Sequence, residues 1–450
     1  MTSRDESQTF DRRTLLRGAG LAAAMALPIA ALADASAAAR AMTPDELLQN
    51  GAATPDELFR NGAFAEAARG YRRRLHDDPE DAHAAARLGY IALLSNRFGP
   101  AETFLSRAVD LDPGDVASRR RLAECFVRQD RHARAVPLLR QTGDQRDAAF
   151  ATAFARLTGT PWRIEGAAGT RVPFHTLDPV PSVEAALNGG PGRKFLLDTY
   201  GTLDLSAEAA EEAGLRALAT VPGGVADNKP VTIYLGVLDS LRIGRIEIRD
   251  LPVQWIDMRR PPLPDGSQPA GVIGTTVFYH FLTTMDYADR ALVLRRRTEA
   301  QRRRFQARAR RSGASVLPLW LAGDHYPCTL GAVQDSGPRM VTLDTGGIGH
   351  GLDTTAEIAE RLGIAVDRDH PLPGNGPTLY PITAERISLG RASGRDVRGH
   401  AAEKVFPGFP GPGQSAQFGF DLLANITHEF FKPYAITFDY GGMDFYVAGG

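Results

Sequence analysis

The stretch Val341-Thr342-Leu343-Asp344-Thr345-Gly346-Gly347 ends an apolar run with an aspartate and a tight turn. A second stretch, Phe195-Leu196-Leu197-Asp198-Thr199-Tyr200-Gly201, has the same form 146 residues earlier, with tyrosine in place of the first glycine. Two aspartates placed in this way predict a carboxylate pair that shares one proton, because like charges about 3 Å apart cannot both ionise. One member of such a pair can act as a general base and the other as a general acid on a water molecule.

These stretches belong to a longer duplication in the strand-rich part of the chain. Gly244-Arg245 and Gly390-Arg391 also stand 146 residues apart, as do Arg249-Asp250 and Arg395-Asp396. Each aspartate turn leads into an alanine- and glutamate-rich segment that reads as a helix and ends in glycine. Residues 171–297 and 315–450 are therefore predicted to be one fold used twice.

The motifs in the two halves resemble those of the retropepsin-like aspartic proteases. The first half is similar through Leu197-Asp198-Thr199 and the downstream turn Gly271-Val272-Ile273-Gly274. The second half is similar through Asp344-Thr345-Gly346 and Gln417-Phe418-Gly419. This resemblance implies two all-β acid protease lobes that form a bilobal pseudo-dimer within one chain.

The resemblance also implies a role for each residue of these motifs. Asp198 and Asp344 would be the catalytic pair, and Thr199 and Thr345 would each bond to the opposite loop. Gly346 would belong to the second aspartate turn, and Gly274 and Gly419 would lie in the turns beneath the two aspartates. Ordinary strand and turn chemistry is the alternative explanation of these residues.

Tyr200 departs from the family pattern, which has glycine at the third motif position. A side chain there is bulky and limits a sharply turning loop, so Tyr200 puts the first half-site in doubt. The Pro-Gly loops at 221–226 and 372–377 occupy matching places in the two halves. They are candidates for mobile flaps that cover a substrate, with simple surface turns as the alternative.

Residues 42–160 are predicted to form helical repeats with a period of 34 residues. Ala67, Ala101 and Ala135 stand at 34-residue steps, as do Leu88 and Leu122. Small residues at fixed steps let paired helices approach closely, and the pattern resembles tetratricopeptide repeats. Such a stack offers a concave face to an extended peptide or a protein partner, whereas a helical spacer packed on the next domain is the alternative.

Residues 1–41 are expected to be a processing segment. Arg12-Arg13, Leu15-Leu16 and the weakly apolar run 18–33 resemble a bacterial twin-arginine export signal. That run is too short to span a membrane well. The signal predicts a periplasmic or secreted protein that is soluble after cleavage, and a retained amphipathic helix is the alternative.

The composition of the 450 residues is ordinary for a soluble globular protein, and a net charge of -1 argues against a nucleic-acid binder. Cys125 and Cys328 fall in different predicted domains and are expected to be buried thiols. The histidines show no metal-binding spacing, so neither a metal nor a cofactor is predicted. The arginine-rich residues 298–314 predict a solvated linker helix, or a weak contact with an anionic surface.

Together these patterns predict an aspartic endopeptidase that hydrolyses a peptide or protein substrate. Two alternatives stay open. One is a catalytically impaired protease-like protein that binds peptides, which Tyr200 motivates. The other is an envelope scaffold that acts through its tetratricopeptide-like repeats.

Overall fold

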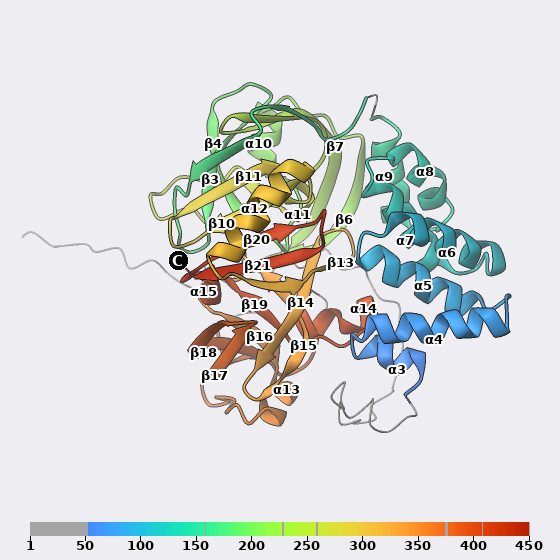
Figure 1. The fold of residues 1–450 in the computed structure, drawn as a ribbon. Helices are drawn as coiled ribbons and strands as arrows, with labels where there is room; N and C mark the ends of the chain where they lie inside the picture. Colours follow the sequence, from blue (N-terminus) through green and yellow to red (C-terminus); the bar gives the residue numbers. More distant parts are fainter. Residues whose placement is uncertain are drawn as a thin grey trace, which may run out of the picture.

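A computed structural model describes residues 53–157, 159–226, 229–257, 260–373, 377–406 and 408–449. Helices form a stack along one side of two β-rich halves (Figure 1). The predicted export segment, residues 1–41, lies outside the described residues, as does the centre of the second candidate flap, 374–376. None of the helices in the described part combines the length and apolar character that a membrane crossing requires.

The helical region repeats every 34 residues. Helices α4, α6 and α8 begin at residues 64, 98 and 132, as the sequence period predicts. Ala67, Ala101 and Ala135 are fully buried, and a Cβ on Gly89 would lie 2.6 Å from Cγ of Leu105, so the helices touch there. The described helices of this region are α3 Pro55–Arg60, α4 Phe64–Asp77, α5 Ala82–Leu94, α6 Phe98–Leu111, α7 Val116–Val127, α8 His132–Arg140 and α9 Gln145–Phe154.

Side-chain caps fix where several of these helices begin. Asp81, Asp115 and Asp144 each accept a hydrogen bond from a backbone N–H in the first turn of α5, α7 and α9. Thr54 and Glu57 form a capping box at α3. Such caps satisfy backbone donors that a helix start otherwise leaves unpaired.

The first β-rich half contains one large sheet. Its order is β1-β8-β5-β9-β4-β3-β7-β6, and β7 also pairs with β8, which closes a barrel. The strands and helices of this half are β1 Arg163–Gly166, β2 Gly169–Pro173, β3 Ser182–Leu187, β4 Gly192–Asp198, β5 Asp204–Ser206, α10 Ala207–Glu212, β6 Ala219–Ala226, β7 Lys229–Ile243, β8 Ile246–Ile256, β9 Gly271–Gly274, α11 Thr275–Phe278, β10 Phe281–Asp286 and β11 Ala291–Arg296. The half begins before the predicted residue 171, because β1 pairs with β8.

The second β-rich half repeats this arrangement. Its sheet has the order β13-β14-β15-β19-β16-β18-β17, and β17 also pairs with β14. Strands β14, β15, β19, β16, β18 and β17 thus take the places of β3, β4, β9, β5, β8 and β7. The elements are α12 Glu299–Arg311, β12 Ser315–Pro318, β13 Trp320–Ala322, β14 Tyr326–Val333, β15 Ser336–Asp344, β16 Leu352–Thr355, α13 Ala356–Arg361, β17 Leu379–Leu389, β18 Ala392–Ala402, η2 Gly411–Gln414, α14 Ser415–Phe418, β19 Ala424–Thr427, α15 His428–Phe431, β20 Tyr434–Asp439 and β21 Asp444–Gly449.

A third sheet joins the halves, with the order β12-β21-β20-β10-β11-β2. At its centre β10 and β20 are antiparallel, and Thr284 pairs with Thr437. The hydroxyls of these two threonines lie 2.7 Å apart. Leu282 pairs with Asp439 and Asp286 with Ala435, so the contact uses equivalent positions from both sides, as a two-fold interface does.

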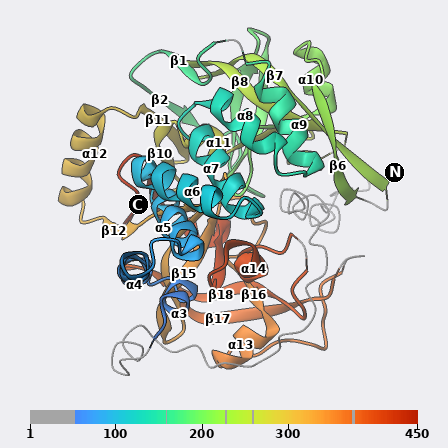
Figure 2. The same ribbon diagram turned by 90° about the vertical axis from the view of Figure 1, so that its right-hand side faces the viewer.

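The helical region packs on both halves (Figure 2). Near its start, Phe59 and Phe64 join one apolar cluster with Phe418 and Phe420 of the second half. Near its end, Ala149 and Ala153 of α9 join another with residues of the β6–β7 hairpin, which contains the first candidate flap, 221–226. This packing favours the interpretation of the helices as a layer fixed to the next domain.

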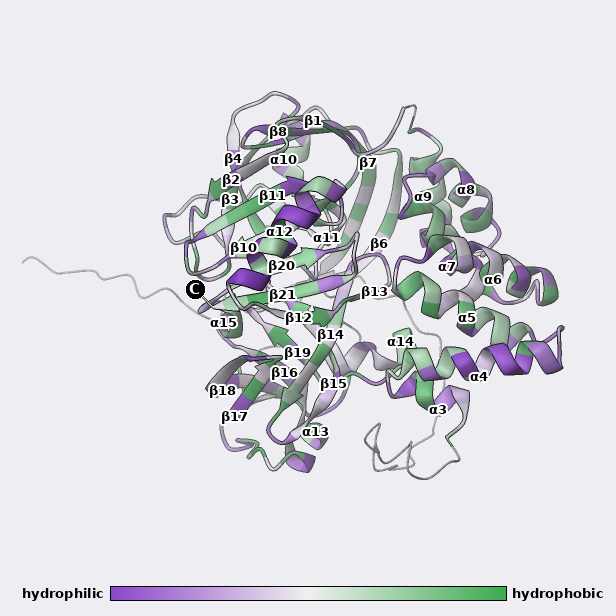
Figure 3. Ribbon diagram, in the orientation of Figure 1, coloured by the Kyte–Doolittle hydropathy of each residue, from purple (hydrophilic) through white to green (hydrophobic). Residues whose placement is uncertain are grey.

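The linker helix α12 is much more hydrophilic than the strands of the core. Helix α12 carries most of the arginines between the halves and is strongly hydrophilic (Figure 3). It is held by Phe305, whose ring packs edge-on against Tyr446 at 5.0 Å. Cys125 and Cys328 are buried free thiols, as the sequence predicts.

Candidate active site

The two motif aspartates stand at the ends of equivalent strands. Asp198 ends β4 and Asp344 ends β15. Each strand lies parallel to a second one, with Asp198 opposite Gly274 and Asp344 opposite Thr427. Both aspartate turns therefore follow the end of a strand that pairs with a second, parallel strand.

Reciprocal hydrogen bonds between the two threonines hold the loops together. The backbone N–H of Thr199 donates to Oγ1 of Thr345, and that of Thr345 donates to Oγ1 of Thr199, both at 3.0 Å. The Thr199 hydroxyl donates to the carbonyl of Leu343 at 2.8 Å, and the Thr345 hydroxyl to that of Leu197 at 3.3 Å. Because both threonines are fully buried, these bonds fix one loop relative to the other.

This frame brings the two carboxyls into contact. Asp198 lies close enough to Asp344 for the neighbouring carboxyl to help raise its pKa. A Cβ on Gly346 would lie 2.4 Å from Cγ of Asp198, so the Asp198 carboxyl occupies the space above that glycine. The lack of space for a side chain favours glycine at position 346. Backbone conformation does not, because the φ angle of Gly346 is not positive.

Backbone amides orient both carboxyls in the same way. The N–H of Tyr200 donates to Oδ1 of Asp198, and the N–H of Gly346 donates to Oδ1 of Asp344, both at 2.7 Å. The φ angle of Tyr200 is not positive, so its place in the turn does not require the backbone freedom of glycine. The turn chemistry of the two half-sites is thus equivalent.

Residues 183–277 match the aspartyl protease family. The matched span runs from β3 to α11 and contains Asp198 and Gly274 but not Asp344. The comparison with curated proteins found no match. Among solved structures, a mutant O-GlcNAc transferase of Thermobaculum terrenum is 22% identical over 27% of this chain and 24% of that chain, with a TM-score of 0.22, too low to carry an argument.

Both carboxyls of the protease-like site have raised pKa values. Burial, together with the neighbouring Asp344 carboxyl, raises the pKa of Asp198 well above its ordinary value. Burial raises the pKa of Asp344 to about 6, although the hydrogen bond from Asn425 opposes the shift. The pair is therefore set to retain a proton under conditions where exposed aspartates are ionised.

Asn425 connects Asp344 to a second buried carboxylate. Its Nδ2 donates to Oδ2 of Asp344 at 2.9 Å and to Oδ2 of Asp353 at 3.0 Å. Its Oδ1 accepts from the Thr342 hydroxyl at 2.7 Å, so the amide orientation is fixed. All four side chains are buried.

Two histidines lie behind Asp353. The Nε2 of His350 is 2.8 Å from Oδ1 of Asp353, and the His350 ring packs against His400 with centroids 4.0 Å apart. Burial alone would lower the pKa of His350, but the Asp353 carboxylate outweighs it and raises that pKa. Burial, with the charge of His350, lowers the pKa of His400 to about 3, so His400 is neutral near pH 7.

In the described part of the first half, no side-chain amide makes such a connection. Asp204 occupies the place of Asp353, but its opposite residue in β9 is Val272, where the second half has Asn425. Asp204 is paired with Arg260 at 3.1 Å instead. Asp198 therefore lacks the side-chain amide that Asp344 has.

The Tyr200 side chain is buried against residues of the second half. Its hydroxyl bonds to the Gln414 side chain and accepts from the Gly411 N–H at 3.2 Å. Its ring packs edge-on against Tyr326 at 4.9 Å. The side chain thus fills a buried site beside the segment between β18 and β19.

Of the two glycines predicted to lie beneath the aspartates, one lies where it was expected. A Cβ on Gly274 would meet the carbonyl oxygen of Gly201 at 2.0 Å, which leaves no room for a side chain beneath the Asp198 loop. Gly419 lies elsewhere: it ends α14 with a φ of 75° and faces Arg87 and Phe59 of the helical region. Its predicted place beneath Asp344 is wrong, because Thr427 pairs with Asp344 there.

Two groups of side chains in the described residues have metal-ligand chemistry, namely His350 with Asp353 and His400, and Asp178 with His428 and Glu429. In the first group, Nε2 of His350 already contacts Asp353 at 2.8 Å. In the second group, Lys432 already contacts Asp178 at 2.6 Å and Glu429 at 2.8 Å. Both arrangements fit ion pairing better than metal coordination.

Proposed function

We propose that this chain is an aspartic endopeptidase that activates water between Asp198 and Asp344. The reciprocal threonine bonds give the strongest support, because they hold two buried carboxyls in contact. The family match over residues 183–277 supports the same chemistry. The repeated strand order supports a bilobal pair of protease-like halves in one chain.

The surroundings of the two carboxyls assign their starting roles. The Asn425 amide stabilises negative charge on Asp344, whereas Val272 offers Asp198 no such donor. In this proposal Asp344 begins as the carboxylate and Asp198 as the carboxylic acid. Because they exchange protons, the pair titrates as a unit.

The hydrolysis then balances as follows. Asp344 takes a proton from water, the water oxygen bonds to the substrate carbonyl carbon, and Asp198 gives its proton to the carbonyl oxygen. In the resulting neutral diol, Asp344 protonates the amide nitrogen while one hydroxyl returns a proton to Asp198. The carbon–nitrogen bond breaks, and the products are a carboxylic acid and an amine.

The pH profile should be bell-shaped. Activity falls at low pH as Asp344 becomes protonated, with the raised pKa of about 6 placing that limb above the range of an ordinary aspartate. It falls at high pH as Asp198, whose pKa burial also raises, loses its proton.

Asp344→Asn and Asp198→Asn variants test the proposal on a library of unfolded peptides between pH 3 and 8. Each is expected to lose at least about 10³-fold in kcat/KM, because a single remaining carboxyl cannot supply both the general acid and the general base. Asp396→Asn, an exposed aspartate of the second half, is the matched control. Full activity of purified Asp344→Asn protein would exclude the dyad.

We also propose export by the twin-arginine route, with a periplasmic or secreted mature protein. The paired Arg12-Arg13 supports it. Replacing both arginines by lysine should leave the protein in the cytoplasmic fraction. Unchanged export of that variant would remove the proposal.

Two surface contacts remain proposals of the same kind. The helical repeats would bind a protein partner, and α12 would make a weak contact with an anionic surface, which its exposed arginines support. Capture of a defined partner by intact protein, lost on substituting the concave helix face, tests the first. Salt-sensitive binding to anionic but not neutral vesicles tests the second.

A further inference from the structure

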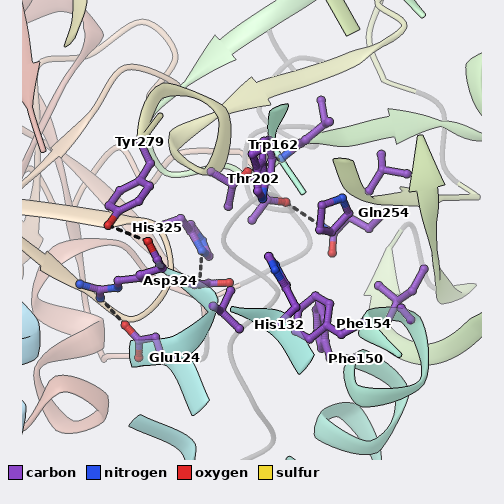
Figure 4. A pocket seen from close by; sticks show the side chains of 18 of the residues that line it. Glu124, His132, Phe150, Phe154, Trp162, Thr202, Gln254, Tyr279, Asp324 and His325 are labelled. Carbon is purple, nitrogen blue, oxygen red and sulfur yellow. Dashed lines mark hydrogen bonds and ion pairs between the residues drawn. The ribbon is translucent and has the colours of Figure 1, made fainter. Parts of the chain in front are cut away.

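A cavity of about 120 Å³ lies between the end of the helical region and the first barrel. Figure 4 shows His132, Phe150 and Phe154 from the helices on one side of it, and Thr202 and Gln254 of the barrel on the other. His325, from the turn before β14, completes a third side. The helices therefore supply part of a binding surface that the barrel alone does not form.

The walls are mainly aromatic and aliphatic. Phe150 and Phe154 of α9 lie across the space from Trp162 (Figure 4), and Leu203 also lines it. Cavities of about 150 Å³ with apolar walls bind benzene. The volume here fits a single six-membered ring or a branched aliphatic side chain.

Three polar atoms of the residues that line this cavity have no hydrogen-bond partner among the described residues. They are Nε of Arg128, Nδ1 of His132 and Nε2 of His325, and all three residues are at least nine-tenths buried. Burial lowers the pKa of His132 to about 4, so its ring is neutral near pH 7. A buried ring nitrogen without a partner is costly, and a ligand hydroxyl can remove that cost.

The cavity adjoins the loop that carries Asp198. Thr202 and Leu203 are the fourth and fifth residues after Asp198, and both line the cavity. Their positions are fixed, since Gln254 Nε2 donates to the Thr202 hydroxyl and the Leu203 N–H donates to Thr276 Oγ1, both at 3.0 Å. Four residues span at most about 14 Å, so the cavity is within a few substrate residues of the dyad.

We propose that this cavity binds an aromatic side chain of the polypeptide substrate, tyrosine above phenylalanine, within a few residues of the bond that is cut. The apolar walls hold the ring, and His132 or His325 bonds the phenol hydroxyl. The proposal rests on the protease function proposed above. It makes the helical region a determinant of substrate choice.

The first experiment measures kcat/KM for peptides that carry Tyr, Phe or Ala at each position near the cut. One position should prefer Tyr over Ala at least about tenfold. Phe150→Trp, which fills the cavity from the helix side, should reduce that ratio to near one. Phe104→Trp is the matched control, because Phe104 lies on helix α6 away from this cavity, and its ratio should match the wild type.

A second variant separates the hydroxyl from the ring. His132→Phe keeps an aromatic ring but removes the polar nitrogen, so the Tyr-to-Phe ratio should fall while the Phe-to-Ala ratio persists. His325→Phe is tested in parallel. A merely structural role would change the overall rate without moving the Tyr-to-Phe ratio.

Binding is measured separately from cleavage, by fluorescence anisotropy of the same labelled peptides with full-length Asp344→Asn protein. Tyr peptides that bind preferentially, with no cleavage by the wild type, would retain the cavity and remove the protease function. Cleavage with no aromatic preference at any position, and no effect of Phe150→Trp, would overturn the cavity proposal and leave the protease function standing. Preference for Phe equal to Tyr would remove the role of the histidines.

Discussion

The two halves present equivalent aspartates to one another with different support behind each. Behind Asp344 lies the amide of Asn425, which reaches on to Asp353. Behind Asp198 the same strand position holds Val272. The two halves thus hold their aspartates on nearly the same backbone frame. The strand position occupied by Asn425 in one half and Val272 in the other makes the surroundings of the two carboxyls different.

The reciprocal hydrogen bonds between Thr199 and Thr345, which form the frame shared by the two halves, are tested first. Thr345→Val keeps the shape of the side chain but leaves the buried Thr199 N–H without its acceptor, which costs about 1–3 kcal/mol of stability. Activity is expected to fall about 10²-fold, because the two loops lose their mutual positioning. Thr199→Val should behave alike, since its bonds are reciprocal.

Thr284→Val is the matched control, since it also removes a buried hydroxyl bond across the halves, far along the third sheet. It should lower stability by a similar amount, measured by urea denaturation, with kcat/KM retained at a temperature where the protein stays folded. Equal loss of activity in both variants would show that the threonine frame has no special role.

Replacing Asn425 by valine, the residue at the equivalent position of the first half, tests whether Asp344 starts as the carboxylate and Asp198 as the acid. Asn425→Val removes the hydrogen-bond donor to Asp344 and should lower kcat/KM about tenfold or more. Because loss of this donor raises the pKa of Asp344, the low-pH side of the activity profile, its acid limb, should move to higher pH. Val272→Thr in the first half is the control and should leave the acid limb in place. An acid limb that does not move in Asn425→Val would contradict Asp344 as the starting carboxylate.

The ion pairs one layer further back give a smaller effect. His350→Gln removes the cationic partner of Asp353 and leaves it only the amide of Asn425. The uncompensated charge of Asp353 then raises the pKa of Asp344 and moves the acid limb of the pH profile to higher pH by up to about one unit. Arg260→Gln leaves Asp204 unpaired in the first half, where Val272 makes no link to the dyad. Its acid limb should stay unchanged, as read from kcat/KM against pH.

The smallest effect is on stability. The folded pKa of each dyad carboxyl is raised above its unfolded value, so the unfolded chain releases the proton first as pH rises. Stability is therefore lost as pH rises from about 4 through the folded pKa. Asp198→Asn removes this cost and should raise the Tm at pH 7 by about 2 °C or more in calorimetry, while the exposed Asp396→Asn leaves it unchanged.

Most of the backbone architecture could be predicted from the sequence, because these elements depend on residues that are close together in the chain. The strand ending in Asp198, the turn after it and the 34-residue helix period each depend on neighbouring residues. The partner of Asp344 in the second half was placed wrongly at Gly419. The separation of Gly274 from Asp286 was the better guide, because the same 12 residues counted back from Asp439 give Thr427.

The network behind Asp344 could not be predicted in the same way. Asn425 contacts residues 72 and 81 positions away, and no repeated spacing marks it, since the equivalent residue is a valine. Tyr200 was judged by the glycine it replaces. Its buried partner Gln414 lies 214 residues away, in a segment between β18 and β19, so only the folded chain shows why the tyrosine is tolerated.

The contact between α9 and the β6–β7 hairpin gives the helical stack a mechanical meaning. Ala149 and Ala153 pack against Val221 and Ile233, so the hairpin cannot lift without separating from the last helix or carrying it along. At its other end the stack is fixed to the second half through Phe59 and Phe64. A change in the curvature of the stack between these two attachments would therefore move the hairpin relative to the second half.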